Sequence, residues 1–237
     1  MTNYQGTDNL QLLEKTAKNY NTFLINLVTQ AGQKRKEEKR KGITVADFGS
    51  GTAFFASQIS QRLSTPVHCI EISENLFSYY KNKPDLILHN SLSELSDCSL
   101  DLIYSFNVLE HIKKDQDYIN LFHQKLKKNG ILVLYLPAFM CLYSSMDKKV
   151  GHYRRYTKSD LISKLSPNFE IIRCEYADSA GFFVTLLYKI FGSKNGEINQ
   201  TALYIFDRFI FPISRFADKI TMGKICGKNI LCIAKKP

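Results

Sequence analysis

The sequence of 237 residues contains no apolar run long enough to cross a membrane. A transmembrane helix needs about 18 or more consecutive apolar residues with few charges, and no stretch reaches that length. The first residues are polar and lack the apolar segment of a secretory signal peptide. We therefore expect a cytoplasmic protein, for which any contact with the inner face of a membrane would be peripheral.

Cysteine pairs with metal-binding spacing are also missing. The six cysteines of the sequence are Cys69, Cys98, Cys141, Cys174, Cys226 and Cys232. No two of them form C-x-x-C, and several lie in apolar segments typical of strands, which indicates buried thiols in a reducing compartment. We expect no disulfides, no zinc site and no metal cofactor. Because no RNA-binding motif is apparent, nucleic acid is not an expected partner.

The composition is that of a basic, globular protein. Hydrophobic residues make up 44% of the chain and aromatic residues 12%, which is enough to build a core. The length fits one sizeable domain with an insertion better than two domains. The formal net charge of +10 favours anionic partners, such as phosphorylated or carboxylated substrates, anionic lipid or nucleic acid. The lysines are widely scattered, so a generally lysine-rich surface is the alternative explanation.

Residues 45–60 form the segment around which the rest of the chain is organised. This segment begins as a short apolar strand, breaks at Gly49 and Gly51, and continues with apolar residues at helical spacing. Glycines at such a junction let the backbone turn sharply and approach a ligand closely. Asp47, at the end of the strand, could attract a cation or accept hydrogen bonds. The alternative is an ordinary strand–turn–helix without a ligand.

A second predicted strand, at 66–71, ends in an acid. Glu71 follows Gly51 by twenty residues, a spacing typical of βαβ units in which a carboxylate binds the ribose hydroxyls of a nucleoside. The dinucleotide fingerprint G-x-G-x-x-G requires a third glycine where this sequence has Phe54. A bulky ring at that position argues against NAD.

Two segments resemble those of class I S-adenosylmethionine-dependent methyltransferases. The run D-F-G-S-G-T-A at 47–53 resembles their motif I, D-x-G-x-G-x-G, with Ala53 in place of the third glycine. The run D-L-I-Y-S-F-N-V-L-E-H-I at 101–112 resembles the segment after the fourth strand of many small-molecule methyltransferases, similar to types 11 and 12. The resemblance implies S-adenosylmethionine as the donor, S-adenosylhomocysteine as the product, and no metal.

The resemblance also implies an α/β fold, namely a Rossmann-like, seven-stranded, mostly parallel sheet with helices on both faces and an antiparallel last strand. We predict strands that begin at 45 and lie at 66–71, 85–90, 100–106, 131–136, 169–176 and 229–234, and helices at 8–31, 115–128 and 160–165. The whole chain, 1–237, would be a single methyltransferase domain. Its parts would be an N-terminal helical segment (1–41), a cofactor-binding core (42–177), an aromatic helical insertion between strands six and seven (178–227), and the last strand with a basic tail (228–237).

Several residues would hold the donor if the resemblance is followed. Tyr20 belongs to a Tyr-Asn pair that lies across the donor in some family members, Glu71 would hold the ribose, and Asn107 would border the site of methyl transfer. Asn90 and Ser91 fall where the family usually has an acid that meets the adenine amino group. The full expected donor set is Tyr20, Asp47, Gly49, Ser50, Gly51, Glu71, Ile72, Asn90, Ser91, Leu92 and Asn107.

Residues 147–157 form a basic, aromatic loop after the fifth predicted strand. Its Gly-His-x-Arg-Arg-Tyr run resembles that of a bacterial methyltransferase group often associated with glycosyltransferases and envelope or polysaccharide biosynthesis. Arginine binds phosphate or carboxylate through a two-pronged fork, and histidine titrates near neutrality, as a general base requires. The expected catalytic residues are His111, His152 and Tyr153, and the expected substrate-binding residues are Arg154, Arg155 and Tyr156. The alternatives are a basic surface loop and a purely structural role for His111.

The insertion carries an apolar stripe at helical spacing from Leu203 to Ile220, interrupted at Pro212. One interpretation is a helical cap that packs on the edge of the sheet and closes the site. The other is an interfacial helix or a lid for a lipid-linked substrate, with peripheral membrane contact through 182–220.

The predicted function is methyl transfer from S-adenosylmethionine to a small-molecule, saccharide or lipid-linked acceptor that is anionic. A nicotinamide-dependent oxidoreductase is disfavoured by Phe54. The other alternative is a non-catalytic membrane- or protein-interaction module on the same fold, suggested by the aromatic, basic C-terminal third. The acceptor, the methylated atom and the oligomeric state stay open at this point.

Overall fold

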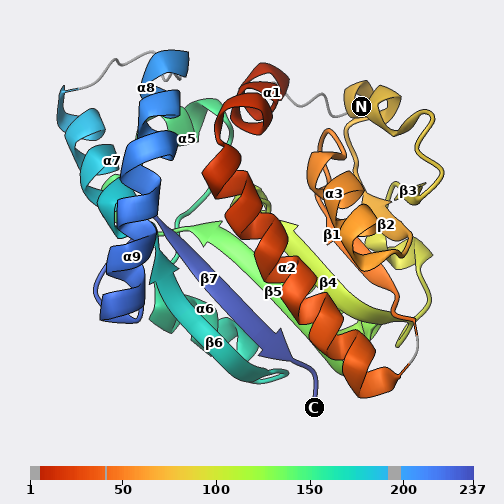
Figure 1. The fold of residues 1–237 in the computed structure, drawn as a ribbon. Helices are drawn as coiled ribbons and strands as arrows, with labels where there is room; N and C mark the ends of the chain where they lie inside the picture. The colour runs from red at the N-terminus through yellow and green to blue at the C-terminus, as the bar shows by residue number, and fades with distance from the viewer. Residues whose placement is uncertain (1–5, 41, 192–198) are drawn as a thin grey trace.

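The computed structural model describes residues 6–40, 42–191 and 199–237, and a single seven-stranded sheet lies at its centre (Figure 1). The strands are β1 (Val45–Phe48), β2 (Val67–Ile70), β3 (Leu86–His89), β4 (Leu100–Phe106), β5 (Leu126–Pro137), β6 (Glu170–Ala177) and β7 (Asn229–Lys235). Their order is β3-β2-β1-β4-β5-β7-β6. Neighbouring strands among β1 to β5 run parallel, whereas β7 is antiparallel to β5 and β6. The predicted sheet and its antiparallel last strand are confirmed.

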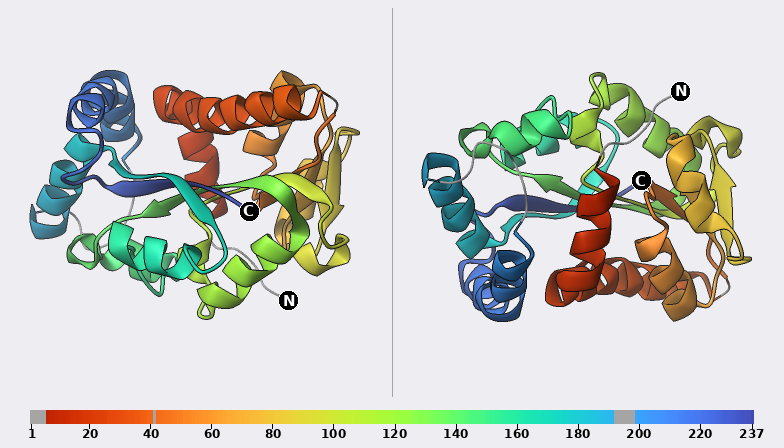
Figure 2. Two further views of the ribbon diagram at one scale, coloured as in Figure 1. Left: turned by 90° about the horizontal axis from the view of Figure 1, so that it is seen from below. Right: turned by 90° about the horizontal axis from the view of Figure 1, so that it is seen from above.

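Helices cover both faces of this sheet, as the two views of Figure 2 show. The α-helices are α1 (Thr7–Thr16), α2 (Lys18–Lys39), α3 (Phe54–Leu63), α4 (Asp115–Lys125), α5 (Ser145–Lys149), α6 (Lys158–Leu165), α7 (Ser179–Phe191), α8 (Gln200–Ile205) and α9 (Phe211–Thr221). Shorter helical turns are η1 (Glu74–Tyr80), η2 (Leu92–Glu94), η3 (Leu109–His111), η4 (Met140–Leu142) and η5 (Phe206–Ile210). One core cluster joins the sheet to α2 and α3, and the other joins it to α4 and α6.

All three predicted helices have different bounds in the structure. The helix expected at 160–165 begins two residues earlier, as α6, and the helical segment expected to end at 31 continues to the end of α2. The helix expected at 8–31 is broken at Ala17, which leaves the helical conformation with φ −90° and ψ 61° between α1 and α2. The apolar repeat runs through this break, so periodicity alone does not reveal it. The helix expected at 115–128 ends at Lys125, because Leu126 already pairs with Leu100 as the first residue of β5.

The insertion forms a helical layer at the β6–β7 edge of the sheet, where α7 lies beside α9 and α8 stands end to end with α9 (Figure 1). A π-helical turn, η5, joins α8 to α9, and Pro212 occupies the first turn of α9. A proline fits that position because the N–H groups of a helix's first turn have no partner inside the helix. The helix does not stop at Pro212, because Ile210 and Phe211 keep the right-handed helical conformation; the change from π-helix to α-helix falls just before the proline. None of the helices in the described ranges is both long and apolar enough to span a bilayer.

The strand order reverses beside β1, which lies between β2 and β4. In open parallel sheets, ligands bind outside the carboxyl ends of the strands at such a reversal. The segments that leave β1, β2 and β4 at this edge are those that follow Phe48, Ile70 and Phe106. They contain most of the residues that the sequence singles out.

Candidate functional site

The glycine loop after β1 is tied back to β2. The backbone N–H groups of Gly49 and Ser50 both donate to the carbonyl of Ile70, at 2.9 and 3.1 Å. Gly49 has a left-handed φ of +79°, and a Cβ atom there would collide with the side chain of Val108, just beyond β4. Gly51 is also left-handed, with φ +55°. Only glycine both adopts the left-handed φ without strain and leaves room for the Val108 side chain. It lets the loop lie close against the end of the sheet.

Ala53 shows how the loop accommodates the missing third glycine. It is fully buried and left-handed, with φ +61° and ψ 17°, immediately before α3. Glycine adopts this conformation freely, whereas a residue with a Cβ atom is strained there by roughly 1–2 kcal/mol. The departure from the family motif therefore adds strain but leaves the path of the backbone unchanged.

Glu71 links the ends of β1 and β2. One carboxylate oxygen accepts the N–H of Gly51 at 2.8 Å, and the other accepts the N–H of Ser73 at 2.8 Å. The residue is 7% exposed. A carboxylate has about four lone-pair sites, so these two hydrogen bonds leave acceptor capacity for two further donors.

Asp47, at the end of β1, is a buried carboxyl group. It accepts the hydroxyl of Tyr104 at 2.9 Å. Burial raises the pKa of Asp47 to about 8, and the negative charge of Glu71 adds to the effect, while the hydrogen bond from Tyr104 opposes it. A cation near this group would stabilise its ionised form.

Asn107 and Tyr20 meet beyond the end of β4. Asn107 is left-handed (φ +53°), which asparagine tolerates better than most residues, and its Nδ2 donates to the Tyr20 hydroxyl at 3.4 Å. The Tyr20 ring packs edge-on against Tyr135 and Phe211, with ring centroids 5.9 and 5.7 Å apart. Tyr20 thus lies between the sheet and the helical insertion.

Asp207, in the π-helical turn of the insertion, holds Tyr20 in place. Its two carboxylate oxygens accept the backbone N–H groups of Asn19 and Tyr20, each at 2.9 Å. The Asn19 side chain donates in return to the Asp207 carbonyl at 2.8 Å. These contacts cap the start of α2, where Ala17 has no side-chain acceptor to offer.

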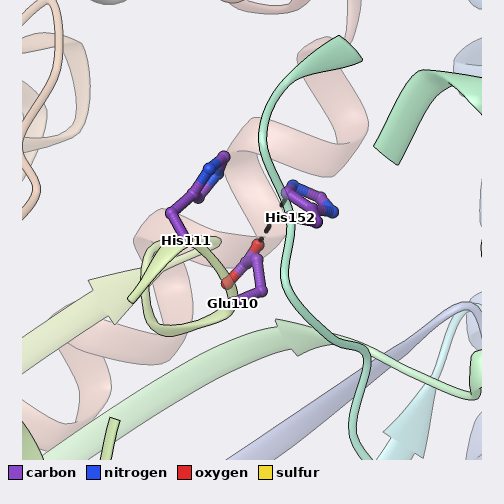
Figure 3. A group of neighbouring side chains, drawn as sticks. All are labelled: Glu110, His111 and His152. Carbon is purple, nitrogen blue, oxygen red and sulfur yellow. Dashed lines mark ion pairs between the residues drawn. The ribbon is translucent and has the colours of Figure 1, made fainter. Parts of the chain in front are cut away.

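Glu110, His111 and His152 come together in front of the same sheet edge (Figure 3). One potential ligand atom from each residue lies within 4.8 Å of the other two. Glu110 is fully buried, and burial raises its pKa to about 8. In the part of the chain that the structure describes, neither of its carboxylate oxygens has a hydrogen-bond partner. Burial, and then the proximity of His152, lower the pKa of His111 to about 4.

Asp147 orients His152. The Nδ1 of His152 lies 2.7 Å from Oδ1 of Asp147, and Arg155 donates to both oxygens of the same carboxylate, at 2.8 and 3.0 Å. Burial by itself would raise the pKa of Asp147, but the hydrogen bonds from His152 and Arg155 hold it well below its usual range. An ionised carboxylate only accepts, so the His152 proton lies on Nδ1 and Nε2 keeps its lone pair.

Solved structures with the same fold include several methyltransferases. A methyltransferase from Mesorhizobium loti described as S-adenosylmethionine dependent is 15% identical, with 82% of this chain and 91% of that chain covered and a TM-score of 0.54. A chain from the complex of the Haloferax volcanii Trm112 methyltransferase activator with a methyltransferase is 11% identical, with 83% and 84% covered and a TM-score of 0.57. Haemonchus contortus phosphoethanolamine N-methyltransferase 2, with phosphomonomethylethanolamine and S-adenosylhomocysteine bound, is 19% identical, with 83% and 49% covered and a TM-score of 0.54. At these identities the likeness shows the fold.

A comparison with family models also matches the segment that contains the glycine loop. Residues 46–134, from β1 through most of β5, match the family model of a methyltransferase domain. The matched segment is similar to a methyltransferase domain, and the sheet around it has the Rossmann-like fold of methyltransferases. No curated protein matches the sequence.

The residues expected at adenine lie at the β2–β3 side of the sheet. Ile72 is 62% exposed, and Leu92 is buried in the core. The Ser91 side chain accepts the N–H of Ser93 at 3.1 Å and so caps η2. Asn90 is exposed. Contact of these residues with adenine stays a prediction.

The residues expected to bind substrate have partners within the chain. Arg154 pairs with Asp115 at 2.7 Å, and the buried Tyr156 donates its hydroxyl to Asp115 at 2.9 Å. Arg155 is occupied by Asp147. Tyr153 is 57% exposed, and its backbone N–H donates to the Glu110 carbonyl at 2.8 Å. These contacts give Arg154, Arg155 and Tyr156 a structural role. Binding of a substrate by these residues stays a prediction.

Sequence reasoning missed three acids that organise the site. Glu110 was adjacent to a candidate histidine, and Asp147 lay in the candidate loop, but neither was singled out as a site residue. The capping carboxylate of Asp207 acts on Tyr20 across 187 positions of sequence. No local pattern reports a contact at such a separation.

Proposed function

We propose that the protein transfers a methyl group from S-adenosylmethionine to an anionic small-molecule, saccharide or lipid-linked acceptor. The reaction is a direct displacement, in which an oxygen, nitrogen or carbon of the acceptor attacks the methyl carbon in line with the departing sulfur. Positioning of the two reactants supplies much of the rate enhancement in such a reaction. The observation that carries the proposal is the Glu71 carboxylate, fixed beside a glycine loop of the methyltransferase motif.

On the donor side, we assign a role to each residue from its position in the structure. Gly49 and Gly51 let the backbone approach the aminocarboxypropyl chain of the donor. The buried Asp47 carboxyl offers its negative charge to the donor's ammonium group, directly or through water. Glu71 uses its spare acceptor sites for the ribose hydroxyls, and Asn107, with Tyr20, borders the methyl group. Ser50 shapes the loop through its hydroxyl, which lies 2.6 Å from that of Tyr80.

On the acceptor side, His111, His152 and Tyr153 are the candidates for contact with the acceptor. They lie beyond Asn107 on η3 and on the loop after α5. With Nδ1 of His152 hydrogen-bonded to Asp147, Nε2 is the ring nitrogen left to take a proton from the acceptor. An anionic group on the acceptor would match the basic charge of the chain.

The test is calorimetric titration of S-adenosylmethionine and S-adenosylhomocysteine into the wild type and Glu71→Ala. We expect micromolar binding that Glu71→Ala weakens at least tenfold, or about 1.4 kcal/mol. Glu74→Ala is the matched control, since Glu74 is an exposed acid three residues further along. Thermal melts verify that each variant is folded. No binding by the folded wild type, or equal binding by Glu71→Ala, would contradict the proposed donor site.

A second proposal concerns the outer face of the insertion, which we infer contacts an anionic lipid surface. The π-helical turn and α9 expose Phe209, Ile213, Phe216 and Ile220 at a spacing of four, three and four residues, with exposed fractions of 60 to 68%. Their polar neighbour Ser214 is fully buried and Asp218 is 3% exposed. The helix therefore points its apolar side toward solvent and its polar side inward.

The surroundings of this apolar face favour a membrane. Phe183 and Leu187 on the adjacent α7 are also 57% and 56% exposed, which enlarges the face. Arg208, Lys219 and Lys224 are exposed along the same segment. Contiguous apolar patches of this kind mark interaction surfaces, and apolar residues flanked by cations suit the interface of an anionic bilayer.

Cosedimentation with vesicles tests this contact. We expect binding to phosphatidylcholine vesicles that contain phosphatidylserine, weaker binding to pure phosphatidylcholine, and loss of binding in the double variant Ile213→Ser, Phe216→Ser. Ile172→Ser, which changes another exposed isoleucine, on β6, is the control. Unchanged binding of the double variant, or a stable dimer that this variant dissociates in light scattering, would contradict membrane contact through this face.

A further inference from the structure

The buried carboxylate of Glu110 lacks a compensating partner. It is fully buried, and both oxygens are without a hydrogen bond in the described part of the chain. The Arg155 guanidinium nearby is already occupied by Asp147. Buried charges in proteins are normally paired or coordinate a metal, because an isolated one is costly. The Nε2 of His152, at 3.8 Å from Oε1 of Glu110, is within ion-pair reach but too distant for a hydrogen bond.

Two imidazoles share the space in front of this carboxylate. The rings of His111 and His152 meet edge to face with centroids 4.5 Å apart, and Figure 3 shows the Glu110 carboxylate pointing into the gap between them. The potential ligand atoms lie within 4.8 Å of one another. Ligand atoms at about 2.0–2.2 Å from a shared metal are separated by up to about 4 Å. Small side-chain movements would therefore bring all three onto one ion.

Both histidines also have the outer partners that metal ligands use. Asp147 holds Nδ1 of His152, and the fork of Arg155 holds Asp147. His111 is hydrogen-bonded to the backbone of Val150. A metal-binding histidine commonly donates its second N–H to a carboxylate or a backbone carbonyl, which fixes the ring and leaves the other nitrogen for the metal.

We propose that Glu110, His111 and His152 hold a divalent first-row transition-metal ion of the zinc class. Two imidazole nitrogens and one carboxylate oxygen suit such ions better than magnesium, which prefers oxygen ligands alone. Three protein ligands leave a position open for water or substrate, as in catalytic zinc sites. This site departs from the sequence-based expectation of no metal.

The role of the metal rests on the proposed methyl transfer. The open position takes a hydroxyl oxygen of the acceptor, whose pKa the metal lowers. The hydroxyl releases its proton to solvent, and its oxygen forms the bond to the methyl carbon. The carbon–sulfur bond breaks with its electron pair on sulfur, which leaves S-adenosylhomocysteine. The methylated atom is then oxygen.

Metal titration of the chelator-treated full chain tests the site. We expect one equivalent of Zn²⁺ in calorimetry and one of Co²⁺ by visible absorption, with submicromolar affinity for Zn²⁺. Glu110→Gln and His152→Ala should each weaken Zn²⁺ binding at least a hundredfold, and Asp147→Asn, which acts through His152, tenfold or more. Glu110→Gln should fold well, since it replaces a buried carboxyl group without hydrogen-bond partners among the described residues by a neutral side chain of the same size. The control is His89→Ala, because His89 belongs to a separate histidine pair with His68 at 2.9 Å.

Donor titrations on the same samples separate this proposal from the proposed function. S-adenosylhomocysteine should bind wild type and Glu110→Gln equally, with or without Zn²⁺. Donor binding without any Zn²⁺ uptake would overturn the metal site and leave His152 to act as a base by itself. Zn²⁺ uptake that Glu110→Gln and His152→Ala do not change would also overturn it. Zn²⁺ uptake lost in both variants supports the site even if no donor binds, in which case it is the methyl transfer that fails.

Discussion

The substitution Asp207→Ala tests how the insertion positions the donor side of the site. The Asp207 carboxylate accepts the N–H groups of Asn19 and Tyr20, the second and third residues of α2. These groups have no partner inside the helix, and Ala17 cannot cap them. Removing the carboxylate therefore leaves two N–H groups without their acceptor and releases the contact between α2 and the insertion.

The expected loss can be worked out from these two hydrogen bonds. A side-chain cap contributes about 0.5–2 kcal/mol, and a hydrogen bond to a charged group about 1.5–3 kcal/mol. Because Asp207 is only 4% exposed, water replaces the lost contacts poorly. We expect the free energy of unfolding to fall by about 2–4 kcal/mol. For a domain of this size, that lowers the Tm by roughly 5–15 °C.

The assay is urea unfolding followed by far-ultraviolet circular dichroism, together with S-adenosylhomocysteine titration. Asp207→Asn, which keeps one acceptor, should lose less stability than Asp207→Ala. Asp85→Ala is the control, since Asp85 is exposed, and should change stability by less than about 0.5 kcal/mol. A loss of the same small size for Asp207→Ala would refute the capping argument. Unaltered donor affinity would refute the link from Asp207 through Tyr20 to the donor.

Substitutions at four other positions have definite expected outcomes. Gly49→Ala should lower the free energy of unfolding by about 3 kcal/mol or more, because the new Cβ atom is strained and overlaps a neighbouring side chain. Ala53→Gly should raise the free energy of unfolding by up to about 1 kcal/mol, because it relieves the left-handed strain. Thermal melts measure both. The folded-state pKa of Asp47 is raised to about 8, so its contribution is favourable at low pH and is lost as pH rises toward 8. Asp47→Asn should therefore gain stability relative to wild type between about pH 4 and 8 in urea titrations, and an advantage that shrinks over that range would contradict the shift. Arg155→Ala should cost about 3–5 kcal/mol because it strips the buried Asp147 of its guanidinium, and Arg155→Lys should restore only part of this in the same melts.

The loops proposed to hold the donor could be predicted from the sequence because their signals are local. The strand before Gly49, the helix after Ala53 and the acid at Glu71 lie within about 30 residues of one another, the length of a βαβ unit. The parallel sheet was implied by the resemblance of two local segments, 47–53 and 101–112, to class I methyltransferases. The structure confirms the sheet, its antiparallel last strand and the insertion.

The rest of the site depends on contacts between distant segments. The break at Ala17 is stabilised by Asp207, whose partners are 187 and 188 positions away. Arg155 looked like an anion-binding residue in a basic loop, but it forms a fork with Asp147, eight residues earlier. Residue type predicts that an arginine binds a carboxylate or phosphate, while only the folded chain shows which one.

The central claim is that Glu71 holds the donor's ribose at the ends of β1 and β2. A crystal structure with S-adenosylhomocysteine bound tests this claim most directly. We predict both ribose hydroxyls within hydrogen-bond distance of the Glu71 carboxylate, about 2.5–3.0 Å between oxygens, with the sulfur near Asn107. A nucleoside bound elsewhere on the chain, or one whose ribose does not contact Glu71, would contradict the account.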